Sequence, residues 1–468
     1  MTTAKNWDYR RALQELWRRS SYERGLISDP FGTVETAEAG LRRMRTLLAA
    51  MNNPQMRVPA VHIAGSKGKG STGAMIAAAA RQAGHRVGFY SSPHLHRFPE
   101  RILVDGSALS DDAFAAETEA AARAAARLEG GESEPTQVTT FELITAMAFA
   151  AFARRTCDLA VIEVGLGGRY DATNVLQPAV SVITRIDLEH TAVLGSTYAA
   201  IAEQKAGILR TGVPCVASPQ VEAAAETITH VAREIGAPLL MGGRDWTWQG
   251  SWRHFDATGP WGHWRDIEVG IPGPHQVENA CTALAAIAMV TAAGIDIPDG
   301  AARSGLRTVS WPGRFERLRD GAHSVIFDGA HTPAAAEALV ATWREAHLAE
   351  PATVIFGMGG DKNIDAVLAG LRPLIGRLIA TAANSPRSAD PAAIAAIARE
   401  LAIPVSVHPS VADAVADARA SGAGPILITG SLFVVGEARE AFGLAEPDRE
   451  WQALNDAHRS GNETPDRA

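Results

Sequence analysis

A short segment rich in glycine and lysine has the residue types and spacing of a phosphate-binding loop. An apolar run at 60–64 leads into it, and the alanine-rich stretch 74–83 behind it predicts a helix. Strand, glycine turn and helix in this order point backbone N–H groups and a helix N-terminus at one spot, where a polyphosphate is stabilised. The candidate phosphate-binding residues are Gly65, Ser66, Lys67, Gly68, Lys69, Gly70 and Ser71.

Within this loop, Lys69 is the candidate cation for the β- and γ-phosphates of ATP, and Ser71 offers a hydroxyl near magnesium. The spacing departs from the usual Walker pattern, because two residues rather than four separate the first two glycines and Gly70 follows the lysine. The surrounding strand and helix nevertheless favour a phosphate site over an ordinary turn.

Two further polar side chains follow apolar runs of the same region. Glu163 lies near the carboxyl end of the run 158–165, and His190 follows the run 179–186. Open α/β sheets place ligands at the carboxyl ends of their strands, so Glu163 is a candidate magnesium ligand. A lone histidine is more often structural. Lys205 lies in a helical pattern, and its position alone gives it no role.

The elements that must hold these residues form an alternating pattern. From 58 to about 217, apolar strand-like runs alternate with helical segments, which is typical of a parallel sheet with crossover helices. Five tryptophans between 246 and 264 predict a packed hairpin, with nucleobase stacking as a less favoured alternative, and an alanine-rich helix is predicted over 279–293. The glycines at 357–360 lack dinucleotide spacing and indicate a tight turn.

Pro312-Gly313 separates this region from a second strand and helix series. The fold class predicted is α/β, with an N-terminal P-loop domain containing a parallel sheet and a smaller Rossmann-like C-terminal domain. The boundaries predicted are 1–311 for the ATP-binding domain and 312–446 for the C-terminal domain, with a polar, mobile tail at 447–468.

Composition restricts the partners. The chain has 468 residues, 46% of them hydrophobic, and a formal net charge of −8, which argues against a nucleic-acid surface. Neither a signal peptide nor an apolar run of ~20 residues is evident, so no membrane association and a cytoplasmic location are expected. Three widely spaced cysteines form neither a disulfide framework nor a zinc pattern.

Taken together and in order, these segments resemble the folylpolyglutamate synthase and dihydrofolate synthase family of the Mur-ligase superfamily. The resemblance covers about residues 40 to 440. The matching segments are HIAGSKGKGST at His62, SSPHLHRFPERI at Ser91, TTFELITAMAF at Thr139, IEVGLGGRYDATN at Ile162, LEHTAVLGST at Leu188, IAEQKAGI at Ile201, HQVENACTAL at His275, WPGRFE at Trp311, DGAHTP at Asp328 and ITGSLFVVGEAR at Ile428.

The resemblance implies an ATP-dependent ligase that adds L-glutamate to folate, acting as a monomer. It implies magnesium ligation by Ser92, Glu163, His190 and Lys205, with Lys205 carbamylated and a monovalent cation such as K⁺ as a further candidate. It implies ATP contacts at Asn279, Arg314 and Asp328 beside the phosphate loop, so that the nucleotide lies between the domains. It implies a pterin-side pocket at Thr139, Tyr170, Asp171 and Ala172.

The chain departs from the family pattern at a few positions. Gln204 replaces a usual glutamate, Thr332 a common asparagine and Ser66-Lys67 a frequent Thr-Asn. The early pattern of many bifunctional members is present only as 37–41, so use of dihydropteroate beside folate stays open.

Amide formation from a carboxylate requires activation, so the expected route is phosphorylation by ATP to an acyl phosphate and attack by the glutamate amine. Two alternatives remain: a Mur-type ligase acting on a nucleotide-sugar peptide, and a P-loop ATPase that drives a partner without ligation.

Overall fold

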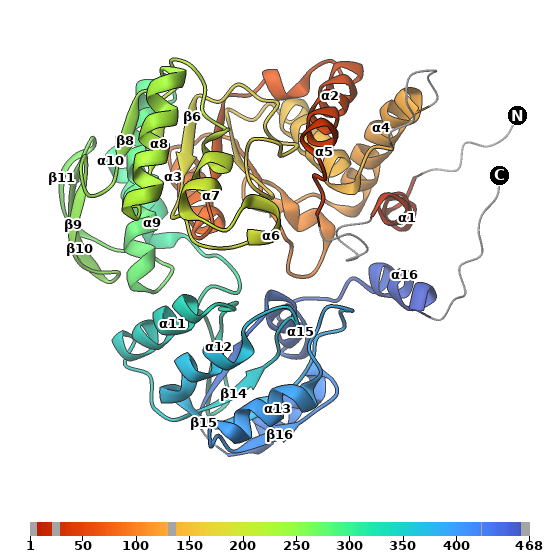
Figure 1. The fold of residues 1–468 in the computed structure, drawn as a ribbon, viewed down its shortest axis with the longest axis vertical. Helices are drawn as coiled ribbons and strands as arrows, with labels where there is room; N and C mark the ends of the chain where they lie inside the picture. Colours follow the sequence, from red (N-terminus) through yellow and green to blue (C-terminus); the bar gives the residue numbers. More distant parts are fainter. Residues whose placement is uncertain (1–6, 21–28, 130–136, 423, 460–468) are drawn as a thin grey trace, which may run out of the picture.

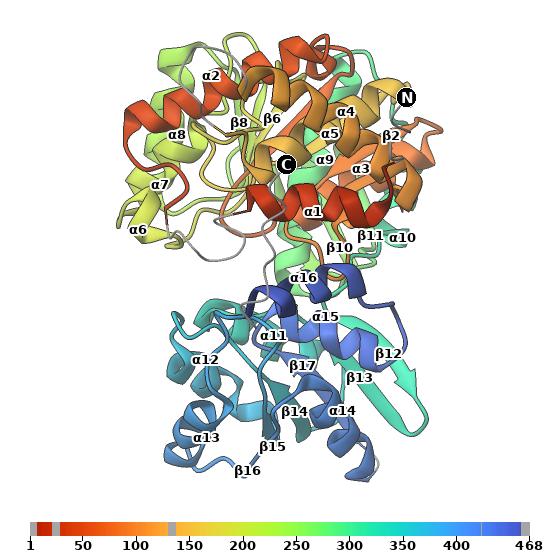
Figure 2. The ribbon, with the colours of Figure 1, turned by 90° about the vertical axis from the view of Figure 1, so that its right-hand side faces the viewer.

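The structure is a computed structural model that describes residues 7–20, 29–129, 137–422 and 424–459. Figures 1 and 2 show two units, one above the other. We call the described residues up to Thr308 the N-terminal unit and residues 316–441 the C-terminal unit. Both have mixed α/β architecture, as the sequence predicts.

An eight-stranded sheet forms the centre of the N-terminal unit, in the order β4-β3-β2-β5-β1-β6-β7-β8. The neighbours from β2 to β8 pair in parallel, whereas β3 and β4 are antiparallel additions at one edge. These strands are β1 (Ala60–Ala64), β2 (Val87–Tyr90), β3 (Ile102–Val104), β4 (Ser107–Ala108), β5 (Leu159–Glu163), β6 (Val180–Ile183), β7 (Cys215–Ala217) and β8 (Leu239–Met241). After β1 the chain adds strands β2 to β5 on one side of β1 and strands β6 to β8 on the other side. Where the strand order reverses in this way, an open sheet has a ligand crevice at the carboxyl ends of its strands, here at the end of β1.

Helices cover both faces of this sheet. They are α1 (Tyr9–Arg19), α2 (Val34–Ala50), α3 (Lys69–Gln82), α4 (Asp111–Glu129), α5 (Thr140–Arg154), α6 (Thr191–Leu194), α7 (Tyr198–Ala206), α8 (Glu222–Ile235), α9 (Pro274–Ala292) and α10 (Asp299–Thr308), with 3-10 turns η1 (Pro54–Met56) and η2 (Phe98–Arg101). The small side chains of α3 let it pack closely: a Cβ at Gly305 of α10 would lie 2.4 Å from the Ala79 backbone. This close packing fixes the helix that follows the phosphate loop.

The tryptophan-rich segment forms one strand more than the predicted hairpin. Strands β9 (Thr247–Ser251), β10 (His254–Gly259) and β11 (Gly262–Ile267) make an antiparallel sheet. Trp246 and Trp264 are buried in the core shared with α3 and α9. Helix α9 begins at Pro274, five residues before the predicted start, because proline suits the first position of a helix.

A six-stranded sheet in the order β12-β13-β17-β14-β15-β16 forms the C-terminal unit. Among the described strands of this sheet, β12 and β13 pair antiparallel and the other neighbours pair in parallel. Its elements are β12 (Glu316–Asp320), β13 (His323–Phe327), α11 (Pro333–Glu345), β14 (Ala352–Phe356), α12 (Ile364–Leu371), η3 (Arg372–Leu374), β15 (Ile375–Ala380), α13 (Pro391–Glu400), β16 (Val405–Val407), α14 (Val411–Ala420), β17 (Pro425–Thr429) and α15 (Leu432–Ala441).

The segment for which a mobile tail is predicted contains helix α16 (Arg449–Arg459). This helix returns to the N-terminal unit, where Trp451 packs against Trp17 and Phe98 with ring centroids 4.9 and 4.5 Å away. Asp448 also accepts a hydrogen bond from the Tyr9 hydroxyl. Burial of these aromatic rings gives α16 a docking site that its polar composition does not indicate. Residues 460–468 lie outside the described residues.

Candidate active site

The predicted phosphate loop connects the end of β1 to the start of α3, which begins at Lys69. Gly68 precedes the helix with a φ of 91°, and a Cβ there would lie 2.3 Å from Asn279 Oδ1. Two backbone hydrogen bonds anchor the loop, because the N–H groups of Ser66 and Lys67 both donate to the Arg185 carbonyl. No side chain caps the N-terminus of α3, whose amides therefore face the loop. This is the backbone arrangement that binds phosphate.

Three lysines converge on this loop around one carboxylate. Lys69 Nζ and Lys205 Nζ donate to the Gly65 carbonyl at 3.0 and 2.8 Å. Glu189 lies 3.0 Å from Lys67 Nζ and 3.7 Å from Lys205 Nζ. Glu189 is not among the residues predicted for the site, although it stands directly before His190 in the sequence.

The charges perturb one another strongly. Burial would raise the pKa of Glu189, but the ammonium groups of Lys69, Lys67 and Lys205 lower it to about 2. Burial, followed by the Lys69 charge, lowers the pKa of Lys205 to about 7. The helical lysine that sequence patterns would place on the surface is thus buried, with a side chain 3% exposed. Groups with pKa values this far from normal concentrate at functional sites.

Glu163 is the last residue of β5 and faces the same region. Burial raises its pKa to about 7, while the Lys69 charge, the Ser92 backbone N–H and the Arg314 charge act to lower it. His190 precedes α6 with a φ of 49°, and burial lowers its pKa to about 4. The predicted magnesium set therefore lies around the phosphate loop. Among the described residues no group of three or more His, Cys, Asp and Glu side chains forms a metal cluster.

The predicted ATP contacts approach from α9 and from the C-terminal unit. Asn279 Nδ2 donates to Gln276 Oε1 at 2.9 Å, and Gln276 in turn lies 3.4 Å from the Ser71 hydroxyl. The charge of Arg314 acts on both Glu163 and Asp328. Asp328 accepts the N–H groups of Phe315 and Ala330 and so shapes the turns around it.

Sequence reasoning missed Trp311, which stands on the connection between the two units. Its ring packs against Phe89 with centroids 5.3 Å apart, and a Cβ at Gly70 would lie 3.1 Å from its Nε1. The connection therefore docks on the first turn of α3. Only the tertiary structure reveals this contact, because no spacing in the sequence relates the two segments.

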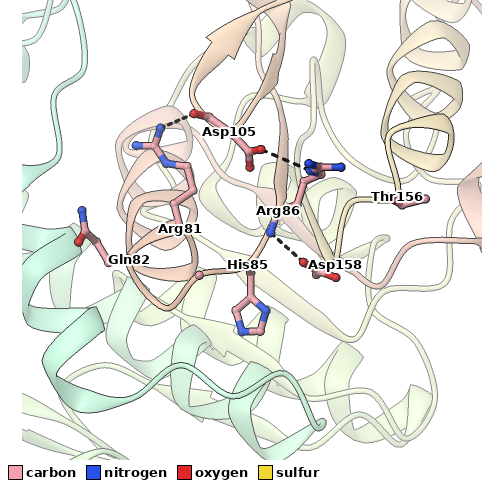
Figure 3. Close-up of a pocket in the computed structure, with 8 residues that line it drawn as sticks. Arg81, Gln82, His85, Arg86, Asp105, Thr156 and Asp158 are labelled. Atoms are coloured by element: carbon pink, nitrogen blue, oxygen red, sulfur yellow. Dashed lines mark hydrogen bonds and ion pairs between the residues drawn. The ribbon is translucent and has the colours of Figure 1, made fainter.

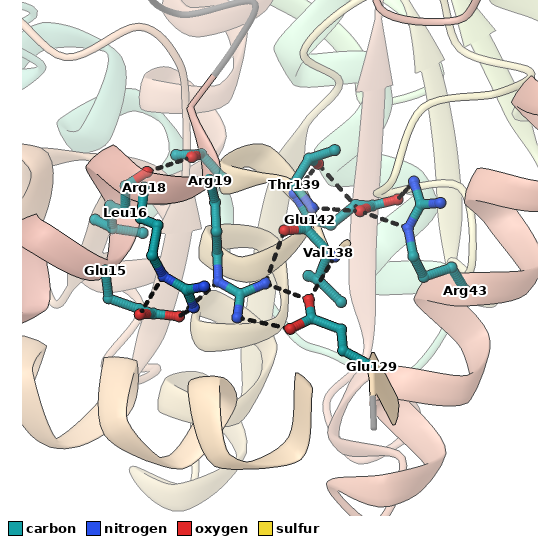
Figure 4. A network of polar contacts seen from close by, with 10 residues as sticks. Glu15, Leu16, Arg18, Arg19, Arg43, Glu129, Val138, Thr139 and Glu142 are labelled. Atoms are coloured by element: carbon teal, nitrogen blue, oxygen red, sulfur yellow. Dashed lines mark hydrogen bonds and ion pairs between the residues drawn. The ribbon is translucent and has the colours of Figure 1, made fainter. Parts of the chain in front are cut away.

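The residues predicted for the pterin side fall into two groups. Thr139 forms a capping box with Glu142 at the start of α5, and Glu142 is held by a two-pronged contact from Arg43 at 3.0 and 2.7 Å (Figure 4). Asp171 is buried and accepts N–H groups of Leu166 and Thr173. No hydrogen bond between described residues joins these two groups.

One cavity lies away from the phosphate loop. A pocket of about 750 Å³ is lined by Arg81, Gln82, Gly84, His85, Arg86, Asp105, Thr156 and Asp158 (Figure 3). It lies beside the start of β2 and the end of α3, at the opposite end of the sheet from the phosphate loop. Arg86 pairs with Asp105, and its backbone N–H donates to Asp158, so the charges that line the pocket satisfy one another. We do not assign it to the active site.

Comparison with known proteins defines the class. Residues 63–287 match the Mur ligase middle domain, and residues 313–432 match the Mur ligase, glutamate ligase domain. The α/β units and the phosphate loop with its lysines thus belong to an ATP-dependent amide ligase of the Mur type. None of the helices in the described ranges combines the length and apolar character needed to cross a bilayer.

Individual relatives narrow this class. The chain is 34% identical over 451 residues to dihydrofolate synthase/folylpolyglutamate synthase of Mycobacterium tuberculosis, which covers 87% of this chain and 90% of that protein. It is 33% identical over 409 residues to folylpolyglutamate synthase of Lacticaseibacillus casei, with 86% and 94% covered. The crystal structure of Mycobacterium tuberculosis folylpolyglutamate synthase complexed with ADP and AMPPCP matches with a TM-score of 0.82 and 31% identity, covering 94% of this chain and 100% of that chain. The chain belongs to the folylpolyglutamate synthase and dihydrofolate synthase family.

Proposed function

We propose that this protein uses ATP to join L-glutamate to the carboxylate of a folate. The observation that carries the proposal is the convergence of Lys69, Lys205, Glu163 and the Arg314 charge on one phosphate loop between two units. The substrate follows from the names of the relatives, all of which include folylpolyglutamate synthase. Because one of these names also includes dihydrofolate synthase, dihydropteroate is a second candidate substrate.

The residues of this chain would act mainly by positioning and charge. The amides of Gly68 to Ser71 at the start of α3 and the Lys69 ammonium would hold the ATP phosphates, while the Ser66 and Lys67 amides anchor the loop to the Arg185 carbonyl. Asn279, Arg314 and Asp328 would contact the nucleotide. Charge would build up on the transferred phosphoryl group, where Lys69 and Arg314 stabilise it. The substrate carboxylate would leave this step as an acyl phosphate, which the glutamate amine attacks with loss of phosphate. This scheme needs no covalent enzyme nucleophile, because the binding energy of the substrates holds the reacting groups in position.

The donor set fits magnesium. Mg²⁺ takes oxygen ligands and keeps several waters, so it needs few protein groups beside the phosphates of a substrate. Glu163 and the Ser92 hydroxyl would supply oxygen ligands, His190 would add an imidazole nitrogen, and the bound ion would neutralise phosphate charge. Burial of the Glu163 carboxylate among positive charges supports this assignment. A monovalent cation such as K⁺ is a further candidate, and a cytoplasmic monomer is the expected state.

We further assign a carbamate to Lys205, as the family resemblance implies. Its Nζ is buried and lies 2.8 Å from the Gly65 carbonyl oxygen. Burial favours the neutral amine over the charged ammonium, and carbamate formation needs the neutral amine. A carbamate would offer oxygen ligands to a hard cation and would place a second anion beside Glu189, with Lys67 and Lys69 as neutralising cations.

The carbamate has a direct test. Lys205→Ala should lose ligation, recover part of it with added short carboxylates and bind ATP nearly normally. A carbamate carbon should also appear by ¹³C NMR in labelled bicarbonate, and should disappear in Lys205→Ala. Full activity of Lys205→Ala would refute the assignment.

On the pterin side, Thr139, Tyr170, Asp171 and Ala172 would line the pocket. The Asp171 carboxylate accepts hydrogen bonds from Leu166 and Thr173, which supports a role in holding the shape of the loop 166–173. The pterin would then meet the side chains of Thr139 and Tyr170 rather than the Asp171 carboxylate.

One assay tests the substrate. Phosphate release from ATP is scanned over tetrahydrofolate, dihydropteroate and UDP-muramyl substrates, each with and without glutamate. We expect release that requires both a folate and glutamate. Release that needs neither would favour a P-loop ATPase, and release with a UDP-muramyl substrate alone would favour a different Mur-type ligase.

A further inference from the structure

The segment 91–101 of the N-terminal unit contacts helix α15 of the C-terminal unit through His96. His96 Nδ1 lies 3.0 Å from Glu440 Oε1, and Arg439 Nε donates to His96 Nε2 at 3.1 Å. Since Nε2 accepts, Nδ1 carries the proton and donates to Glu440. The His96 side chain is only 4% exposed, so both hydrogen bonds are shielded from water.

The backbone of this segment also lies directly against α15. A Cβ at Gly436 would lie 2.7 Å from the Leu95 carbonyl oxygen, so the helix has no room for a side chain at this position. Figure 2 shows α15 on the side of the C-terminal unit that faces the N-terminal unit. Arg439 is held in turn by an ion pair with Glu316 on β12.

The segment is internally rigid. The Glu100 carboxylate accepts backbone N–H groups from Leu95, His96 and Arg97, at 2.9, 3.1 and 3.1 Å. Ser91 N–H also donates to the Arg101 carbonyl, which closes the base of the loop. A displacement of His96 is therefore transmitted to the whole segment.

The other end of the segment reaches the active site. Strand β2 pairs in parallel with β5, with Tyr90 opposite Ile162, so Ser91 and Ser92 follow β2 at the sheet edge where β5 ends in Glu163. A hydrogen bond from the Ser92 backbone N–H acts to lower the pKa of the buried Glu163 carboxylate. One short, braced segment thus connects α15 with the carboxylate that we assign to magnesium.

We propose that His96 is a positioning residue that aligns the C-terminal unit with the active-site end of β5. Its contacts with Arg439 and Glu440 set the position of the segment 91–101, and with it the placement of Ser92 beside Glu163. The proposal rests on the proposed function, in which both units act on one nucleotide. It assigns no direct contact between His96 and substrate.

The test compares two substitutions of His96. His96→Gln keeps a donor and an acceptor on its terminal amide, whereas His96→Leu keeps an apolar side chain of similar size without hydrogen bonds. We expect His96→Leu to lower kcat for glutamate ligation about tenfold or more, as for loss of a buried hydrogen bond to a charged group. We expect His96→Gln to recover most of this loss, with the Kd for ADP unchanged within about threefold in both variants because the phosphate loop is untouched.

Two controls separate alignment from folding. His408→Leu removes a more exposed histidine–carboxylate contact, to Asp417 at 2.9 Å within the C-terminal unit, and should leave kcat unchanged. Gly436→Ala leaves His96 intact but pushes the segment away, and should lower kcat like His96→Leu.

Hydrogen exchange gives a readout that does not depend on the substrate. The amides of Leu95, His96 and Arg97 should exchange faster in His96→Leu than in wild type, and not in His408→Leu. If wild type fails to ligate any folate while these amides respond, the proposed function is wrong and the contact stands. Wild-type kcat in both His96→Leu and Gly436→Ala would overturn the positioning role.

Discussion

Replacing Gly68 by alanine separates backbone strain from loss of a contact at the phosphate loop. Gly68 has a φ of 91°, a conformation that costs an alanine roughly 1–2 kcal/mol. Its new Cβ would also meet Asn279 Oδ1 at 2.3 Å. Asn279 must then turn away and lose its hydrogen bond to Gln276, a further loss of about 1 kcal/mol.

Gly84 provides a matched control at the other end of the same helix. Its φ is 90°, but a Cβ there would have nothing within 4 Å. Gly84→Ala should therefore lower the free energy of unfolding by the strain alone, roughly 1–2 kcal/mol. Gly68→Ala should lower it by about 2–3 kcal/mol, the sum of strain and lost contact.

Nucleotide binding distinguishes the two variants more sharply. A displaced Asn279 should raise the Kd for ADP at least about fivefold in Gly68→Ala, which corresponds to about 1 kcal/mol. Gly84→Ala should bind ADP as wild type does. Urea denaturation and titration calorimetry measure the two quantities. Equal ADP affinity in both variants, within twofold, would refute the placement of Asn279 at the nucleotide.

Lys69→Ala should lower ligation roughly a hundredfold or more while the protein stays folded, because a charge at the transferred phosphate is lost; near-normal turnover would contradict the phosphate-loop assignment. Scattering should show compaction when an ATP analogue binds, weaker in Arg314→Ala, and identical profiles would argue against domain closure. Arg19 is buried between Glu15 and Glu129 (Figure 4), so Arg19→Met should destabilise by about 3–5 kcal/mol. Arg18→Met removes a 58% exposed partner of Glu15 and should cost at most about 1 kcal/mol in denaturation; equal losses would contradict the role of burial.

The sequence alone determined the α/β fold class and the succession of strand, glycine loop and helix at the phosphate loop, whereas the order of strands within the sheet came from the structure. Alternating apolar runs and helical patterns are local, and the glycines of 65–70 follow a strand and precede a helix in a way that local physics constrains. The class of reaction followed from the resemblance of the motifs, in their order along the chain, to a known ligase family. The C-terminal limits of the two predicted helices were close, but both helices begin five residues earlier than predicted, α3 at Lys69 and α9 at Pro274.

What only the tertiary structure decided is which side chains meet. Lys205 reads as a surface lysine, yet it is buried against Gly65, which lies 140 residues away in the chain. Trp311 and His96 carry no local signal, Glu189 is marked only by its place before His190, and the partners of all three come from other segments. Helix α16 is a further case, because its polar sequence does not indicate that Trp451 packs against Trp17 and Phe98 of the N-terminal unit. Periodicity reports which face of an element is apolar, but burial and charge depend on what packs against that face.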